Sequence, residues 1–92
     1  MNKVALHYID RYKEYKSNAE FVIARLERLS ANASYTHDAN THICLINSTL
    51  DRATSCLTRG YESKFKEWVD KLEDRLDEAV DYMIKVGKEI AK

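Results

Sequence analysis

Residues 1–33 read MNKVALHYIDRYKEYKSNAEFVIARLERLSANA, and an apolar or aromatic side chain recurs in them at alternating steps of four and three residues. The members of this series are Met1, Ala5, Tyr8, Tyr12, Tyr15, Ala19, Val22, Leu26, Leu29 and Ala33. Such spacing is typical of a long helix that keeps one face against partner helices. A helix of about 30 residues is roughly 45 Å long and cannot bury its own stripe. The rest of the chain, or a second copy, must therefore cover it.

Two further stretches repeat the same spacing. The second stripe consists of Ala39, Ile43, Ile46, Leu50, Ala53 and Leu57. The third consists of Phe65, Val69, Leu72, Leu76, Ala79, Met83, Val86 and Ile90, with Trp68 and Val80 beside it. No stretch alternates with a period of two residues, so the pattern predicts helices and no strands.

The two interruptions between the stripes have turn chemistry. Residues 30–40 are rich in Ser, Asn, Thr, His and Asp, which favour turns and helix starts. We expect a turn near residues 32–36, with Ser34 or Thr36 as the N-cap of the second helix. We expect Gly60 to end that helix in the left-handed conformation. The alternative is one helix that continues through Gly60 into Tyr61.

The chain is therefore predicted to be all-α, as one helical domain over residues 1–92, with helices at about 3–32, 36–59 and 62–90. Short links make consecutive helices antiparallel neighbours. The predicted architecture is an antiparallel three-helix coiled-coil-like bundle with a long, a shorter and a long helix. The long helices would extend past the shorter one, and a homodimer is one way to cover these extensions.

Composition excludes several classes of protein. The chain has 15 basic and 15 acidic residues and a formal net charge of zero, so no overall field draws it to nucleic acid. We expect no sequence-specific nucleic-acid binding. No run of 18 apolar residues occurs, and we expect no association with a membrane. Two cysteines, with charges near the N-terminus where a secretory signal would be apolar, lead us to expect a cytoplasmic protein.

The sequence offers weak candidates for chemistry. His37, His42 and Cys44 are close in sequence, but His37 and His42 would point about 140° apart on a helix, whereas zinc ligands prefer steps of three or four residues. We expect exposed histidines at a helix start, no metal site and no cofactor. Glycine-rich phosphate loops and nucleophile elbows do not occur, so we expect no enzyme.

The third helix carries an unusual run of acids. Four aspartates fall within about 60° of each other on the helical wheel, and Glu73 and Glu78 flank them. We call the acidic ridge Asp70, Glu73, Asp74, Asp77 and Asp81. Like charges at i,i+4 within it cost on the order of 1–2 kcal/mol if nothing relieves them. We hypothesise that the ridge docks on a basic partner surface. The alternative is a solvated face relieved by Lys71, Arg75 and basic groups of the first helix.

Phe21 is a second candidate for partner binding. It lies about 140° from the centre of the first stripe, and Leu45 and Ile84 are also off-centre on their own helices. An exposed Phe on a small protein indicates a further packing surface. The alternative is that a helix with two neighbours has a wide buried stripe that includes such residues.

We therefore predict a small non-enzymatic helical protein that binds a larger protein or ribonucleoprotein and regulates or inhibits it. In size and helical class the chain resembles bacteriophage inhibitors of host machinery (anti-CRISPR proteins included), bacteriocin immunity proteins and adaptor bundles. The first of these resemblances implies a phage-encoded inhibitor. The alternative is a structural, homo-oligomeric coiled-coil protein with no foreign partner.

Overall fold

The computed structural model describes the backbone of residues 3–91 and the side chains of residues 6–91. It contains three helices, α1 (Lys3–Ser30), α2 (Thr36–Arg59) and α3 (Glu62–Ala91). These bounds lie within two residues of the expected ones, and residues 3–91 contain no strand. The stripe positions Met1 and Ala5 fall outside the described residues, Ala5 for its side chain only.

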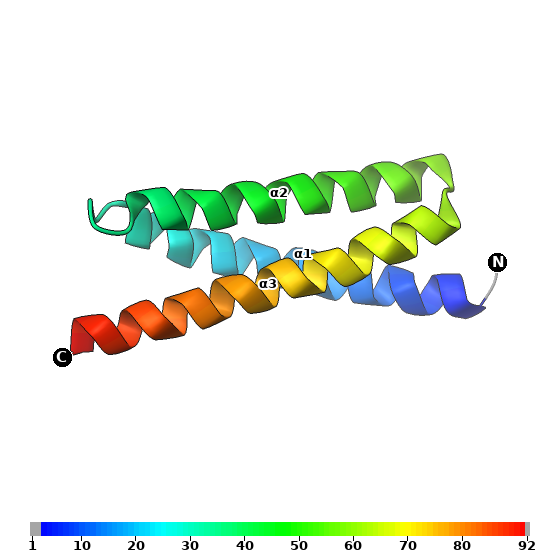
Figure 1. The fold of residues 1–92 in the computed structure, drawn as a ribbon. Helices are drawn as coiled ribbons and strands as arrows, with labels where there is room; N and C mark the ends of the chain where they lie inside the picture. Colours follow the sequence, from blue (N-terminus) through cyan, green and yellow to red (C-terminus); the bar gives the residue numbers. More distant parts are fainter. Residues whose placement is uncertain (1–2, 92) are drawn as a thin grey trace.

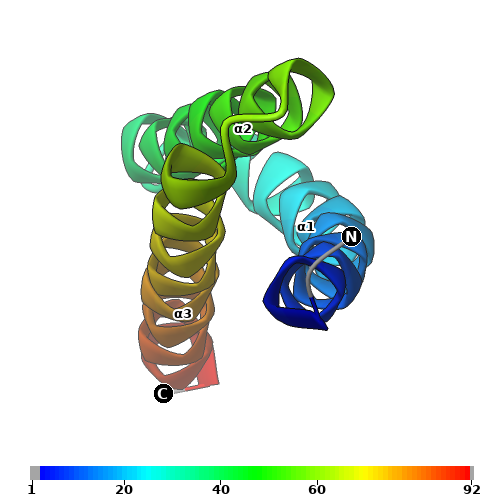
Figure 2. The same ribbon diagram turned by 90° about the vertical axis from the view of Figure 1, so that its right-hand side faces the viewer.

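The chain passes along the bundle three times. In Figure 1, α2 returns beside α1, and α3 returns beside α2. Figure 2 shows α2 on one side, with α1 and α3 next to each other on the other side. Every pair of helices is in contact, which confirms the predicted three-helix bundle. The bundle measures 51 × 18 × 16 Å, so only a narrow column of side chains fits between the helices.

The core consists mainly of the three predicted stripes, packed in two clusters. Its largest fully buried side chains are Leu26, Ile46, Val69 and Leu72. Two stripe positions differ from the prediction. Ala33 is exposed because it lies in the turn after α1, and Ile90 is 62% exposed because the last turn of α3 extends past the start of α2.

One polar residue of the core was not predicted. Thr49 is buried, and its hydroxyl donates a hydrogen bond of 2.7 Å to the carbonyl oxygen of Leu45. This bond satisfies the hydroxyl within its own helix, so Thr49 can occupy a core position without an unpaired polar group.

The turn between α1 and α2 corrects the predicted N-cap. Tyr35 occupies the cap position and makes no side-chain capping bond. Thr36 is already the first helical residue, and its hydroxyl donates backwards to the carbonyl oxygens of Ser30 (2.6 Å) and Asn32 (3.0 Å). The prediction that Ser34 or Thr36 is the N-cap was therefore wrong. The Thr36 hydroxyl bonds to carbonyl groups at and just after the end of α1 and not to N–H groups at the start of α2.

Gly60 ends α2 as predicted, and a helix continuing through it is excluded. Its φ of 76° lies in the left-handed region, and its N–H and that of Tyr61 bond to the last carbonyl groups of α2. A residue with a Cβ is strained in this conformation. Gly60 therefore sets the sharp reversal between α2 and α3.

His42 was expected to be exposed, and this was wrong. Its imidazole is half-buried and stacks on the ring of Tyr82 in α3, with 4.9 Å between ring centroids. The Tyr82 hydroxyl is buried and has no hydrogen-bond partner among the described residues. Burial raises the pKa of Tyr82, with nearby Asp38 as a further cause.

The two glycines form a matched pair for a stability test. Gly60→Ala should lower the free energy of unfolding by about 1 kcal/mol, because its φ is 76°. Gly87→Ala should raise it by roughly 0.5–1 kcal/mol, because Gly87 is helical and an added Cβ meets nothing within 4 Å. Urea unfolding followed by circular dichroism measures both. If both variants changed the free energy of unfolding in the same direction and by the same amount, the left-handed conformation of Gly60 and the helical one of Gly87 would be contradicted.

The hydroxyl groups of Tyr12 and Tyr82 should contribute to the stability of the protein in opposite directions. Tyr12→Phe should destabilise the protein by about 1 kcal/mol, because the Tyr12 hydroxyl bonds to Thr54 at 2.5 Å. Tyr82→Phe should leave stability unchanged or raise it by up to about 1 kcal/mol, because the lost hydroxyl is buried without a partner. Thermal unfolding compares the two variants. A loss for Tyr82→Phe as large as that for Tyr12→Phe would indicate a partner for this hydroxyl.

Candidate interaction surface

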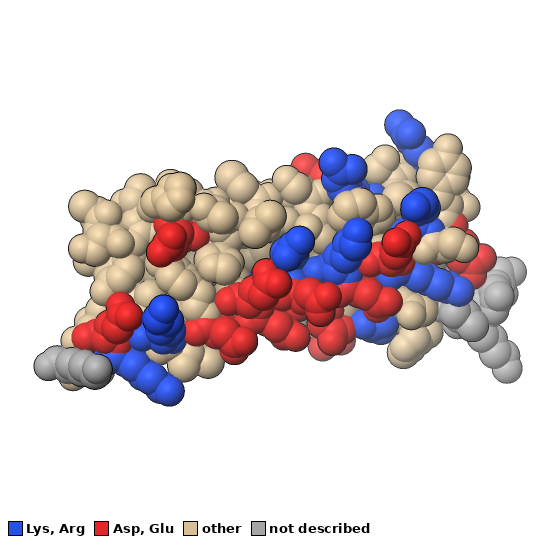
Figure 3. Space-filling model, in the orientation of Figure 1, with Lys and Arg blue, Asp and Glu red and all other residues tan. Residues whose placement is uncertain are grey.

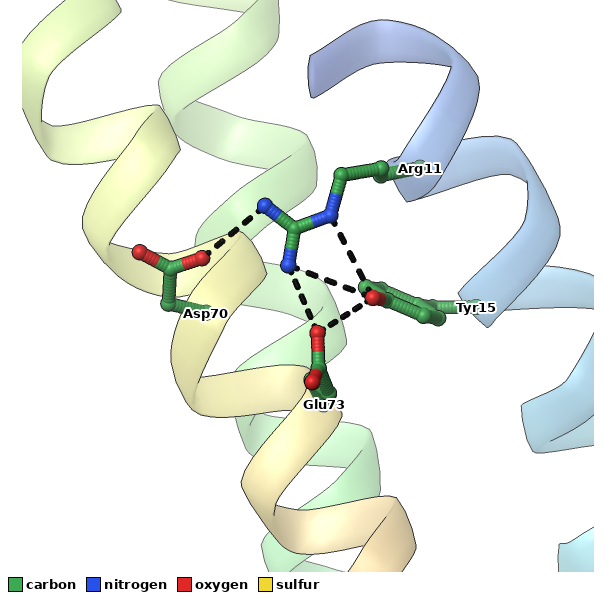
Figure 4. A network of polar contacts seen from close by, with 4 residues as sticks. All are labelled: Arg11, Tyr15, Asp70 and Glu73. Carbon is green, nitrogen blue, oxygen red and sulfur yellow. Dashed lines mark hydrogen bonds and ion pairs between the residues drawn. The ribbon is translucent and has the colours of Figure 1, made fainter. Parts of the chain in front are cut away.

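Arg11 on α1 reaches across to the acidic ridge on α3 (Figure 4). Its guanidinium donates to a Glu73 carboxylate oxygen at 2.6 Å and forms an ion pair with Asp70 at 3.1 Å. The Tyr15 hydroxyl donates to the same Glu73 oxygen and accepts from Arg11 at 3.2 Å. Arg11 also lies over the Tyr8 ring, 5.0 Å from its centroid. These contacts fasten α1 to α3.

The network changes the acid–base properties of its members. Hydrogen bonds from Tyr15 and then from Arg11 lower the pKa of Glu73, because both stabilise the carboxylate. Burial, together with the hydrogen bond to Glu73, raises the pKa of Tyr15. Glu73 is therefore held ionised within the protein, and its charge is already compensated by Arg11.

The acidic ridge thus divides into two parts. Asp70 and Glu73 are engaged by Arg11, which was one of the predicted ways to relieve like-charge repulsion. Asp74, Asp77 and Asp81 are exposed, and among residues 6–91 no ion pair or side-chain hydrogen bond involves them. Figure 3 shows the acidic side chains gathered over α3.

Neither Lys71 nor Arg75 forms an ion pair with this second part. Arg75 pairs with Glu78 at 3.2 Å, along the same helix. The Lys71 ammonium group lies over the Trp68 ring, 4.4 Å from its centroid. Relief by Lys71 and Arg75 was the alternative to partner binding, and in the structure both contact other groups.

A groove runs between α1 and α3, beside the ridge. It encloses about 500 Å³. Its lining residues come from both helices and are Tyr15, Asn18, Phe21, Val22, Arg25, Glu73, Leu76, Asp77, Val80, Met83 and Ile84. A second hollow of about 360 Å³ continues it toward the end of α3 and shares Arg25 and Met83 with it. We call the two hollows together the α1–α3 groove.

The edges of this groove are apolar and exposed. Phe21 is 71% exposed on the α1 edge, and on the α3 edge Ile84 is 53% and Val80 39% exposed. Phe21 and Ile84 were singled out from the helical wheel, whereas Val80 was expected beside the buried stripe. The structure brings all three to one groove. Leu45, also singled out, is 36% exposed on α2, away from it.

Other candidate chemistry is not assembled among the described residues. No three His, Cys, Asp or Glu side chains within them gather in a way that could hold a metal ion. His37 and Cys44 lie along an open hollow on α2, while His42 turns toward Tyr82. None of the helices described is long and apolar enough to cross a membrane.

Comparisons of the chain with protein-family models, with curated proteins and with solved structures found no match.

The Arg11 network predicts a pH-dependent contribution of Glu73 to stability. Because the folded pKa of Glu73 is lowered, its stabilisation is present above the ordinary value of 4.5 and is lost as the pH falls through the folded value. Glu73→Gln should lower the free energy of unfolding at pH 7 by about 1 kcal/mol, a value reduced for its 42% exposure. Urea unfolding at several pH values measures the difference, which should shrink as the pH falls below 4.5.

The matched control is Glu78→Gln. Glu78 forms an ion pair with Arg75 within α3 and is 50% exposed. Pairs of this kind contribute only a few tenths of a kcal/mol. A loss at Glu78 equal to that at Glu73 would show that the contact between α1 and α3 is not the cause.

Proposed function

We propose that this protein is a non-enzymatic binding protein that docks on a basic surface of a larger protein or ribonucleoprotein and regulates or inhibits it. The observation that supports this proposal is the uncompensated part of the acidic ridge. Asp74, Asp77 and Asp81 project from consecutive turns of one helix face, and the nearby Lys71 and Arg75 are directed elsewhere.

Folding alone gives little reason for this arrangement. Like charges at i,i+4, as in Asp77 and Asp81, destabilise a helix, and Asp is a poor helix former. Lys or Ala at these positions would give a more stable α3. A basic partner surface would turn the repulsion into attraction, with an affinity that falls as salt is raised.

The proposal does not depend on an interior site. Between the helices there is room only for the side chains of the core, since the bundle is 18 × 16 Å across. An active site generally needs a concave pocket with converging polar groups. The exposed carboxylates of α3 are therefore a better candidate for function than any buried group among residues 6–91.

Charge reversal tests the proposal. The tagged full chain is used to capture partners from its native host at about 0.1 M salt, where charged surfaces are only moderately screened. Asp74→Lys with Asp77→Lys should abolish capture of the partner, because it places positive charge against a basic surface. Because Asp77 also lines the groove, Asp74→Lys alone is measured as well and should weaken capture in the same direction.

The matched control reverses two exposed acids of α1, Glu20→Lys with Glu27→Lys. It makes the same change in net charge on a different surface and should leave capture intact. Equal capture by the α3 variant and the wild type would refute docking through the ridge. A wild type that captures only its own copies would favour the alternative, a structural homo-oligomer.

A further inference from the structure

The groove between α1 and α3 leaves one side of the bundle without a covering helix. α2 lies on the opposite side of these two helices (Figure 2). The apolar residues Val22, Leu76 and Met83 line the groove, and Phe21, Val80 and Ile84 stand exposed at its edges. A contiguous apolar surface of this kind on a small protein marks an interaction site.

This face carries both a protrusion and the hollow that could receive it. Phe21 is the protrusion, with 71% of its surface exposed, and it borders a hollow of about 500 Å³. A two-fold interface requires that one patch be complementary to itself. The combination of Phe21 with the neighbouring groove meets this requirement.

The charges along the groove select one way to pair two copies. The residues that line the groove include Arg25 and Arg28 of α1 and Asp77 of α3, and Asp81 is exposed one turn beyond Asp77 on α3. A two-fold axis that crosses the bundle at the level of Arg25 and Arg28 would place α1 against α1, with arginines facing arginines. An axis parallel to the bundle places α1 against the partner's α3, so that Arg25 faces the turn of the partner's α3 that carries an exposed aspartate.

We propose that the α1–α3 groove binds a second copy of this chain, in a dimer whose two-fold axis runs parallel to the helices. Phe21 of each copy packs on the partner's Val80 and the partner's Ile84. This interface shares Asp77 and Asp81 with the ridge, whereas Phe21 belongs only to the groove. A change at Phe21 therefore tests the dimer independently of docking through the ridge.

The geometry also pairs individual charges. Within one copy, Arg11 is level with Asp70, and Tyr15 with Glu73, so Arg25 is level with the turn that contains Asp81 and Ile84. A two-fold axis parallel to the helices leaves the position of each residue along the bundle unchanged. Long side chains of a helix lean toward its N-terminus, which brings the Arg25 guanidinium toward the partner's Asp81.

The size of the full chain in solution tests the proposal. Sedimentation over a range of concentrations should show wild-type protein at twice the chain mass of 10.7 kDa. Phe21→Ser should weaken association by about tenfold or more, because a central aromatic anchor is lost, while circular dichroism shows unchanged helix content. Leu45→Ser, a control on α2, should leave association unchanged. A monomeric wild type, or a Phe21→Ser variant that associates normally, would overturn the proposal.

A charge exchange gives the sharper test. Arg25→Glu alone brings acids together across the interface, and Asp81→Arg alone brings arginines together, so each variant should be a monomer. In a mixture of the two, both contacts again join opposite charges, and a dimer containing one copy of each should form. Recovery in the mixture supports the parallel arrangement. Single variants that still dimerise, or a mixture that stays monomeric, would overturn it.

Discussion

The structure depends on the mutual burial of three apolar stripes. No helix of this length can hide its own stripe, and burial of apolar side chains is the main favourable term in folding. In a bundle 18 × 16 Å across, the stripes meet in one column that contains Leu26, Ile46 and Leu72. Since side chains of this column fill the interior, the surfaces that the described residues offer to another molecule lie on the outside of the bundle.

Burial of the stripes leaves the relative placement of α1 and α3 partly open, and Arg11 adds a directional contact there. Its bonds to Glu73 and Asp70 join two helices separated by most of the chain. Tyr15 adds a further hydrogen bond to the same carboxylate. Interactions of charged groups with several hydrogen bonds are more specific in geometry than apolar contacts. The network thus fixes how α3 lies beside α1 near the start of both helices.

The helices could be predicted from the sequence because their signals are local. Stripe spacing depends on one helix at a time, and Gly60 acts through its own φ of 76°. Relief of the ridge by basic groups of α1 was one predicted possibility, but the choice of Arg11 and its bonds to Tyr15 and Glu73 could not be predicted, because they depend on which turn of α3 lies next to α1. The same holds for the stacking of His42 on Tyr82. Exposure of Phe21 followed from the helical wheel, but its position beside Val80 and Ile84 required the arrangement of two helices in space.

The groove begins where the Arg11 network ends, and this order has a physical reason. At the level of Tyr15 and Glu73 the space between α1 and α3 is spanned by hydrogen-bonded polar side chains. Beyond that level the groove is lined by apolar side chains together with Asn18, Arg25 and Asp77, and its edge residues Phe21 and Ile84 remain largely exposed to water. Exposure of a large aromatic side chain forfeits roughly 1.5–3 kcal/mol that burial would supply. Polar bonds therefore join α1 and α3 at one end of the groove, while the rest of the groove, above the buried core of Val22, Leu26 and Leu76, presents exposed apolar side chains whose burial can contribute to binding.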